Sequence, residues 1–356
     1  MYGAAQVPGD LERTAFRKAE KKYKLYKTAS KKSRKKAVET DLSDVYDFKL
    51  ILESFERSGE TPPGIFKFEC DFCRPVFCFE GRPGFYFIPG ALSTEEQCHW
   101  VRESLTRFPQ PPNRTNHNAI YGPIYNLFTA VQNGKSLVEL KNTHEDTGPS
   151  PTSSNQDASR WVFKEKSDFS EGDICNSIAA SLLLRKLRWS TLGLQFDWSK
   201  RNYDVRLPHN KIPDTLCQLA KKLARPAMSE GVQFQPEAAI VNYFSSGDML
   251  GGHLDDMEAD WSKPIVSISL GCKAVFLLGG KAREDSPAAM FLRSGDVVLM
   301  AGQARECFHG IPRIFTEEED AEVSSLASQF QKPEDQLFFA EYIRTSRINI
   351  NIRQVH

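Results

Sequence analysis

The sequence predicts a mainly β protein with flanking helices (α+β), and three observations support this class. Six short apolar runs follow one another between residues 238 and 353, separated by turns that contain Gly or Asp. No long helix is indicated between these runs. The 356 residues include 40% hydrophobic and 11% aromatic residues, which is enough for a large core. The strand pattern favours an antiparallel sheet structure and leaves a sandwich and a jelly-roll both open.

Residues 1–80 are expected to form a basic, helical N-terminal extension. Between residues 13 and 36 there are twelve Lys or Arg side chains and one Glu, although the net charge of the whole chain is zero. Four apolar side chains here have helical spacing: Phe16, Ala19, Tyr23 and Tyr26. Such a helix either meets nucleic-acid phosphates or a nuclear import receptor, or packs its apolar stripe on the body, and the sequence leaves both open.

Eight cysteines and the lack of a long apolar run indicate an intracellular protein that does not cross a membrane. Nucleus and cytoplasm are the expected locations, with an organelle as an open alternative, and a monomer is the expected state. Cys70 and Cys73 form a C-x-x-C pair that is followed by Cys78. Because no fourth ligand is near, free thiols are favoured over a zinc site.

The middle of the chain alternates between helix, loop and strand patterns. Ser93 and Glu96 make a capping box for a helix that extends to residue 105. Residues 140–160 are rich in Ser, Thr, Asn and Pro and are expected to form a flexible loop. The other elements predicted before residue 238 are helices over 44–56, 178–187 and 213–223 and an aromatic strand over 188–198. The six later strands are predicted over 238–244, 265–270, 274–278, 288–292, 296–300 and 347–353.

A metal site is predicted where His253 and Asp255 stand two residues apart. On an extended strand this spacing puts both side chains on one face. His309, just after the predicted strand 296–300, is the best third ligand. An H-x-D pair alone is more often a solvated turn or a core histidine, so the prediction depends on the combination. Two histidines and one carboxylate leave open positions on Fe(II) for a bidentate co-substrate and O2.

The last strand carries two arginines, Arg347 and Arg353, six residues apart. On an alternating strand they share one face, where a guanidinium can hold a carboxylate with two hydrogen bonds. A solvated strand edge is the alternative, which would be favoured if no metal site were predicted nearby.

Together these motifs resemble the AlkB family of Fe(II)/2-oxoglutarate dioxygenases, from about residue 81 to the end. The matching pattern comprises Asn242, His253-x-Asp255, His309 and Arg347-x-Asn349-x-Asn351-x-Arg353. The flanking text resembles the AlkB homologue 1 subgroup, as in Leu187-Arg188-Trp189, Phe196-Asp197-Trp198, Phe276-Leu277-Leu278-Gly279-Gly280 and Ser294-Gly295-Asp296.

The resemblance implies a double-stranded β-helix, or jelly-roll, over residues 236–356 that holds Fe(II) and 2-oxoglutarate and uses O2. Residues 81–235 would be the N-terminal part of the catalytic domain and include a nucleotide-recognition lid. The family pattern places the distal carboxylate of 2-oxoglutarate on Arg347. The other residues that the pattern assigns to 2-oxoglutarate are Asn242, Asn349, Asn351 and Arg353.

One position departs from the family pattern. Phe244 stands where the family commonly has a tyrosine whose hydroxyl donates to 2-oxoglutarate. Its loss removes a hydrogen bond of roughly 1 kcal/mol. Tyr243 is a candidate to compensate, although adjacent strand residues point to opposite faces.

The resemblance also implies a nucleic-acid substrate with N-methylated adenine, either N6-methyladenine in DNA or 1-methyladenine in tRNA. Single-stranded, bubbled or looped sites are expected, because the base must leave its stack. The alternatives are 5-methylcytosine or a methylated protein as substrate, or a binding module with weakened catalysis.

Base contacts are expected from three aromatic residues, Trp189, Phe196 and Trp161, and from the carboxylate of Glu258 or Asp256. Each aromatic residue taken alone is more often part of a core than of a stacking platform. Four basic residues are expected to contact phosphates: Lys186, Arg188, Lys200 and Arg201.

Overall fold

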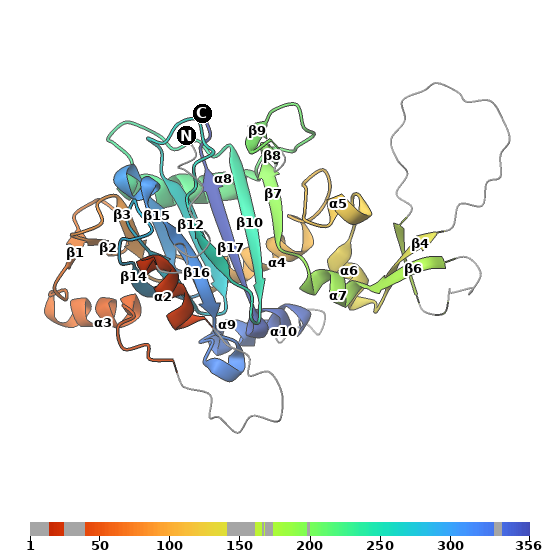
Figure 1. Ribbon diagram of the computed structural model, residues 1–356, viewed down its shortest axis with the longest axis horizontal. Helices are drawn as coiled ribbons and strands as arrows, with labels where there is room; N and C mark the ends of the chain where they lie inside the picture. Colours follow the sequence, from red (N-terminus) through yellow and green to blue (C-terminus); the bar gives the residue numbers. More distant parts are fainter. Residues whose placement is uncertain are drawn as a thin grey trace.

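A computed structural model describes residues 14–24, 40–140, 161–165, 167, 174–197, 200–330 and 337–356. Two antiparallel sheets face each other at its centre (Figure 1). The large sheet has eight strands in the order β1-β2-β3-β15-β12-β17-β10-β7, and the small sheet has four in the order β11-β16-β13-β14. This pair of sheets is the mainly β, jelly-roll core that the sequence predicts.

The strands of the large sheet are β1 (Ile65–Phe68), β2 (Val76–Phe79), β3 (Phe85–Ile88), β7 (Trp189–Gly193), β10 (Ala238–Ser245), β12 (Ile265–Gly271), β15 (Val297–Met300) and β17 (Ser346–Arg353). Those of the small sheet are β11 (Leu250–His253), β13 (Ala274–Leu278), β14 (Ala288–Leu292) and β16 (His309–Ile314). All six strands predicted after residue 238 are confirmed, with bounds that differ by one residue at most.

Side chains of β17 alternate strictly between a polar and an apolar face. Ile348, Ile350 and Ile352 are buried in a core against the helices behind the large sheet. The opposite face carries the two arginines and two asparagines of the predicted motif, and their partners across β10 share that face. Because side chains alternate along the strand, one face of β17 packs in the core behind the large sheet. Its other face lines the interior between the two sheets.

Helices cover the outer faces of both sheets (Figure 1). The α-helices are α2 (Ala15–Tyr23), α3 (Phe48–Ser58), α4 (Thr94–Thr106), α5 (Asn118–Tyr121), α6 (Leu127–Gln132), α7 (Ala180–Arg185), α8 (Asp214–Ala224), α9 (Ser324–Ser328) and α10 (Leu337–Thr345). Three short 3-10 helices are η2 (Arg225–Ala227), η3 (Gly302–Glu306) and η4 (Glu317–Glu319). Helices α4, α8, α9 and α10 share a core with the large sheet, whereas α2 packs on the small sheet. Among the described segments, no helix has the length and apolar character needed to cross a membrane.

Two small sheets lie outside the central pair. β4 (Ser136–Leu140), β5 (Trp161–Lys164) and β6 (Ile174–Ala179) form an arm that extends away from the body (Figure 1). β8 (Gln195–Asp197) and β9 (Asn202–Asp204) form a hairpin beside β7. Most of the loop predicted over 140–160 lies outside the described residues.

Three expectations about the elements need correction. The predicted boundary at residue 80 divides the large sheet, because β1 pairs with β2 and β2 pairs with β3, all antiparallel. The helix expected over 178–187 is limited to α7, since the residues before it pair with β4 as strand β6. The long strand expected over 188–198 is broken at Gly193, which has a φ of 67°.

The N-terminal helix packs its apolar stripe on the body, which was one of the two alternatives that the sequence left open. Phe16 and Tyr23 are 0% and 2% exposed. The helix α2 contacts β11, β13 and β16 of the small sheet. Tyr26, the last member of the predicted stripe, lies outside the described residues.

Candidate metal and co-substrate site

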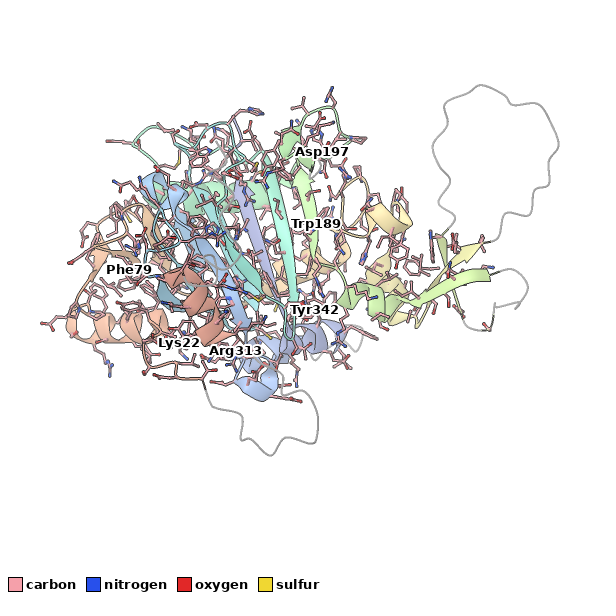
Figure 2. All side chains as sticks on the ribbon, in the orientation of Figure 1. Lys22, Phe79, Trp189, Asp197, Arg313 and Tyr342 are labelled. Atoms are coloured by element: carbon pink, nitrogen blue, oxygen red, sulfur yellow. The ribbon has the colours of Figure 1, made fainter. Side chains whose placement is uncertain are left out.

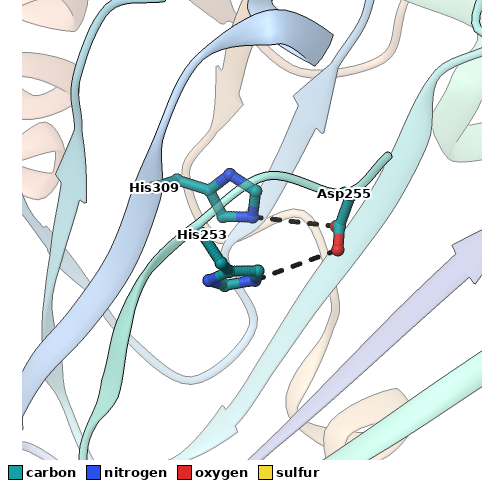
Figure 3. Close-up of side chains that lie close together, drawn as sticks. All are labelled: His253, Asp255 and His309. Atoms are coloured by element: carbon teal, nitrogen blue, oxygen red, sulfur yellow. Dashed lines mark ion pairs between the residues drawn. The ribbon is translucent and has the colours of Figure 1, made fainter. Parts of the chain in front are cut away.

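His253, Asp255 and His309 come together at the mouth of the two sheets. His253 ends β11, and it stands directly opposite His309, the first residue of β16. Asp255 follows two residues later and turns its carboxylate to both rings (Figure 3). The Nε2 atoms of His253 and His309 lie 3.8 Å and 3.7 Å from the two carboxylate oxygens of Asp255. All three potential ligand atoms lie within 4.8 Å of one another.

The two imidazole rings are oriented by backbone carbonyls. Nδ1 of His253 lies 2.9 Å from the carbonyl oxygen of Gly251, and Nδ1 of His309 lies 3.2 Å from that of Cys307. A carbonyl can only accept, so Nδ1 of each ring carries the proton and donates it. Nε2 of each ring is therefore left with a free lone pair that points to Asp255, as metal ligation requires.

The ionisation of the triad also suits a metal. Burial, together with the adjacent His309, lowers the pKa of His253 to about 4, so the ring is neutral at physiological pH. Burial by itself would raise the pKa of Asp255. Arg353, followed by the two histidines, outweighs this and holds the pKa of Asp255 well below its usual range. Two imidazoles and one carboxylate fit the donor set of non-heme Fe(II).

A buried network of charges lies behind Asp255. Arg353 donates from Nη2 to Asp255 at 2.9 Å, and its Nε forms an ion pair with Glu258 at 2.8 Å. Arg305 donates to the other oxygen of Glu258 at 2.7 Å and to the main-chain oxygen of Asp255 at 3.1 Å. Arg305 belongs to η3, just before His309, so the network joins the loops that carry the second and third potential ligands.

Arg347 is a buried cation that forms no ion pair with any acid in the described segments. Its side chain is 1% exposed, and Nη2 donates to Ser269 Oγ at 2.9 Å. Within the described part of the chain, no group accepts from its Nε or Nη1 atoms. Burial lowers the pKa of Arg347 to about 10, which still leaves it charged at neutral pH. A guanidinium held in this way fits a ligand carboxylate, as 2-oxoglutarate supplies.

The asparagines predicted to bind 2-oxoglutarate all lie on the face of β17 and β10 that carries Arg347. They differ in whether their side chains are free to contact a ligand in the cavity. Asn242 and Asn351 line a cavity beside the metal ligands. Asn349 is 6% exposed and donates from Nδ2 to Ser267 Oγ and the carbonyl of Ile268. Asn349 therefore stiffens the β12–β17 pair.

The cavity beside the metal ligands has a volume of about 410 Å³. It is lined by Phe196, Arg201, Tyr203, Ile240, Asn242, Leu250, His253, Leu254, Asp255, Asp256, Met257, Glu258, Asn351 and Arg353. Its size and its mixture of apolar walls with a few polar groups are typical of small-molecule and cofactor sites.

The structure separates the three aromatic residues expected to contact the base. Phe196 lines the cavity from β8. Trp189 lies on β7 opposite Asn242 and does not belong to the cavity lining (Figure 2). Trp161 was expected to contact the base, but it lies on the arm and does not line the cavity. It packs edge-on against Tyr121, with ring centroids 4.9 Å apart.

Two further expected contacts are corrected. Glu258 lines the cavity, but its carboxylate is held by Arg305 and Arg353 and lies 3.3 Å from the Tyr203 hydroxyl, so it does not face a base as a free acceptor. Tyr243 cannot replace the missing tyrosine. Its hydroxyl donates to the carbonyl of Ser104 at 2.6 Å on the opposite face of β10.

Phe244 does lie beside Arg347, with the guanidinium 5.3 Å from the ring centre. It covers the cation with an aromatic face and offers no hydrogen bond.

Three of the four residues expected to contact phosphates have acidic partners. Arg188 lies 2.9 Å from Asp248, Lys200 lies 3.3 Å from Asp197, and Arg201 lies 3.7 Å from Asp256. These pairs are largely exposed, so they compete only weakly with a phosphate.

Cys70, Cys73 and Cys78 were expected to be free thiols and not a zinc site. Among the described residues, the triad is the only group of three or more His, Cys, Asp or Glu placed to hold a metal. Cys70, Cys73 and Cys78 are free thiols, and burial raises the pKa of Cys78 to about 12.

Sequence reasoning missed Tyr203 and Arg305. Tyr203 lines the cavity and pairs directly with Phe196 across the β8–β9 hairpin, with ring centroids 5.2 Å apart. A short aromatic alternation on both sides of a turn could have indicated it. Arg305 is 2% exposed in a 3-10 segment that has no periodic pattern, so no sequence signal identifies it.

Comparison with known proteins places these features in a family. A model of the 2OG-Fe(II) oxygenase superfamily matches residues 84–353. The "DNA N(6)-methyladenine demethylase ALKBH1A" of Arabidopsis thaliana is 62% identical over 360 residues, which cover all of both chains. The human "Nucleic acid dioxygenase ALKBH1" is 30% identical over 79% of this chain and 66% of its own. The "tRNA demethylase abh1" of Schizosaccharomyces pombe is 27% identical over 79% and 82%. A solved structure titled "The structure of OsALKBH1" aligns with 79% of this chain at 20% identity and a TM-score of 0.45.

Proposed function

Because the chain belongs to the ALKBH1 branch of the 2OG-Fe(II) oxygenase superfamily, we propose that it removes N-methyl groups from adenine in nucleic acid. Enzymes of this superfamily use Fe(II), 2-oxoglutarate and O2, so the protein is a dioxygenase. N6-methyladenine in DNA is our first substrate, and 1-methyladenine in tRNA is the second.

One observation carries the choice of a neutral base. Each of the three acids that line the cavity has an arginine within 4 Å. Arg353 lies 2.9 Å from Asp255, Arg305 lies 2.7 Å from Glu258, and Arg201 lies 3.7 Å from Asp256. A cationic base such as 1-methyladenine gains little from carboxylates that are already compensated, whereas neutral N6-methyladenine needs no counter-charge.

The names of the relatives support the same class of substrate. The relative from Arabidopsis, which matches over its whole length, is named for N6-methyladenine in DNA. The relative from fission yeast is named for tRNA. Asp256 is 40% exposed on its side chain and its partner Arg201 is 57% exposed, so this carboxylate can still meet a cation, and this keeps 1-methyladenine as the second candidate.

In the proposed mechanism, His253, Asp255 and His309 would hold Fe(II), and Arg347 would bind the distal carboxylate of 2-oxoglutarate. With both bound, the site would supply an oxidation by O2 in which one oxygen atom goes to succinate, formed from 2-oxoglutarate with loss of CO2, and the other hydroxylates the N-methyl group, which then leaves as formaldehyde. Arg353 neutralises Asp255 from behind and fixes its carboxylate towards the rings.

Phe196 and Tyr203 form an aromatic wall of the cavity, against which a base can stack. A base reaches this cavity only after it has left its stack, which costs a few kcal/mol in a duplex. Single-stranded, bubbled or looped DNA and the loops of tRNA are therefore the proposed forms of substrate.

The test is nucleoside mass spectrometry after incubation with Fe(II), ascorbate and 2-oxoglutarate. Bubbled DNA with N6-methyladenine and tRNA with 1-methyladenine are the two main substrates, and DNA with 5-methylcytosine and a methyl-lysine peptide are the comparison substrates. We expect methyl loss from the first substrate at the highest rate, and none with His253→Ala. Oxidation only of 5-methylcytosine to its hydroxymethyl form, or methyl loss only from the peptide, would overturn the proposal, as would succinate formation without change in any substrate.

We also propose an intracellular location, in the nucleus or the cytoplasm. The seven cysteines that the structure describes are all free, which suits a reducing compartment. Imaging of a C-terminal fluorescent fusion would test this, and accumulation outside the nucleus and the cytoplasm, as in another organelle, would contradict it.

A further inference from the structure

The helix α2 lies on the outer face of the small sheet, behind both histidines. Inward-facing residues of β13, such as Phe276 and Leu278, join the core between the sheets. The alternate residues Val275 and Leu277 point outward, into a cluster with Phe16 and Tyr23 of α2. The helix is thus a fixed layer over strands β11, β13 and β16.

Phe16 occupies the space that side chains at two glycines would need. A Cβ on Gly252 would overlap the Phe16 ring, and a Cβ on Gly279 would lie 2.8 Å from it. Gly252 immediately precedes the metal-ligand candidate His253. The close approach of this ring explains why residue 252 has no side chain, since its backbone does not have a positive φ.

Two charged side chains bind the main chain of Gly252. Glu20 of α2 accepts from the Gly252 N–H at 2.6 Å, and Arg283 donates to the Gly252 carbonyl at 2.8 Å. Both are tied to the helix, because Arg17 donates to Glu20 at 2.9 Å and the Phe16 N–H donates to the Arg283 carbonyl at 3.0 Å. Glu20 is 3% exposed, which is rare for an acid unless its oxygens are bound.

These contacts replace strand pairing at an edge. β11 is the outermost strand of the small sheet, and its register with β16 shifts between Leu250 and His253. Gly252 therefore depends on side chains from outside the sheet to satisfy its N–H and C=O. The preceding carbonyl, that of Gly251, accepts from Nδ1 of His253, so the position of this backbone fixes the orientation of the ring.

We propose that α2 braces the metal site and that Glu20 and Arg283 are positioning residues for His253. They touch neither metal nor substrate. They hold the two-glycine segment whose carbonyl sets the tautomer and direction of the His253 ring. Partners that orient a ligand in this way typically change metal affinity by about 10- to 100-fold when removed.

The experiment is titration of the metal-free full chain with Co(II), followed by its absorption bands, together with thermal unfolding of the metal-free protein. Glu20→Ala is expected to weaken Co(II) binding at least about 10-fold. Glu20→Gln keeps an oxygen that can accept from Gly252, so its affinity should stay within about threefold of wild type. Tyr23→Phe is the matched control on the same helix, because it removes only the 2.8 Å hydrogen bond to Asp44.

Wild-type Co(II) affinity in Glu20→Ala would overturn the proposal. Equal weakening by Glu20→Ala and Tyr23→Phe would also overturn it, since α2 would then act only through overall stability. If Glu20→Ala does not fold, Arg283→Ala removes the other contact to Gly252 from a loop and carries the same expectation. No nucleic acid takes part in this test, so its outcome is separate from that of the proposed demethylation.

Discussion

Two clusters of buried charge lie at opposite ends of strand β13 and differ in how completely they are paired. At one end, Leu278 stands next to His309 and the metal-site network. At the other end, Lys273 precedes the strand and contacts Glu322 at 2.6 Å. Arg293 joins this second cluster with two hydrogen bonds of 2.8 Å to Asp47 and one of 2.8 Å to Glu322.

The second cluster is complete, and the first is not. Each cation of the Lys273–Arg293 cluster has acidic partners, and the cluster ties the first turn of α3 to the small sheet. In the metal-site network Asp255 and Glu258 are paired, whereas nearby Arg347 has no acidic partner among the residues that the structure describes. Buried charges that are all paired therefore indicate a structural cluster. A buried charge that lacks a counter-ion indicates a binding site.

Arg293→Met should have the largest effect on stability. It leaves Asp47 and Glu322 partly buried without their main cation, which typically costs about 3–5 kcal/mol of unfolding free energy. Denaturant unfolding of the metal-free protein measures this. Arg344→Met is the control, because its pair with Glu317 is exposed and should contribute less than about 1 kcal/mol. Equal losses in the two variants would remove the contrast between a buried and an exposed pair.

Glu322→Gln should have a smaller, pH-dependent effect. Burial would raise the pKa of Glu322, but Arg293 and Lys273 outweigh it and lower the pKa to about 2 from its ordinary 4.5. This stabilisation is fully present above pH 4.5 and is lost as pH falls through 2. We expect wild type to exceed the variant by roughly 2 kcal/mol at pH 6 and to approach it at pH 2. A difference that stays constant over this range would show that the pair does not titrate as described.

Phe244→Tyr should have the smallest effect. A hydroxyl next to Arg347 can donate to a bound carboxylate, worth about 1 kcal/mol or roughly fivefold in 2-oxoglutarate affinity. Tyr243→Phe is the control, because its hydroxyl faces the other side of β10, and it should change stability without changing this affinity. Calorimetric titration with Mn(II) in place of Fe(II) measures both. An unchanged affinity in Phe244→Tyr would mean that the ring acts only as a cover for the cation.

Features with a short-range period could be predicted from the sequence. The alternation of β17 indicated both its buried isoleucines and the shared face of Arg347 and Arg353. The position of His309 just after a predicted strand indicated the third ligand, and the spacing of His253 and Asp255 indicated that they converge, although Asp255 lies beyond the end of β11. The prediction for β17 succeeded because strand geometry fixes side-chain direction from residue to residue.

Features that depend on distant packing could not be predicted in the same way. Glu20 stands four residues after Phe16 on the stripe of α2, but only the strand β11 beneath it gives this acid a partner. Arg305 depends on Glu258, 47 residues earlier, and has no local pattern. Trp161 was expected to contact the base, but it lies on the arm and packs against Tyr121. The type of a residue does not by itself show which distant side chain or backbone group it contacts in the fold.

We propose above that the Arg347 guanidinium lacks an acidic partner within the described chain because its counter-ion is the carboxylate of 2-oxoglutarate. Thermal unfolding tests this directly. Thermal unfolding of wild type and Arg347→Met is recorded with Mn(II), with and without 2-oxoglutarate. Without 2-oxoglutarate we expect the variant to be at least as stable as wild type, because a buried unpaired charge is removed. Ligand at 100 times its Kd should stabilise wild type by about 2.7 kcal/mol and leave the variant unchanged. A variant that loses as much stability as Arg293→Met, yet keeps the response to 2-oxoglutarate, would contradict the claim.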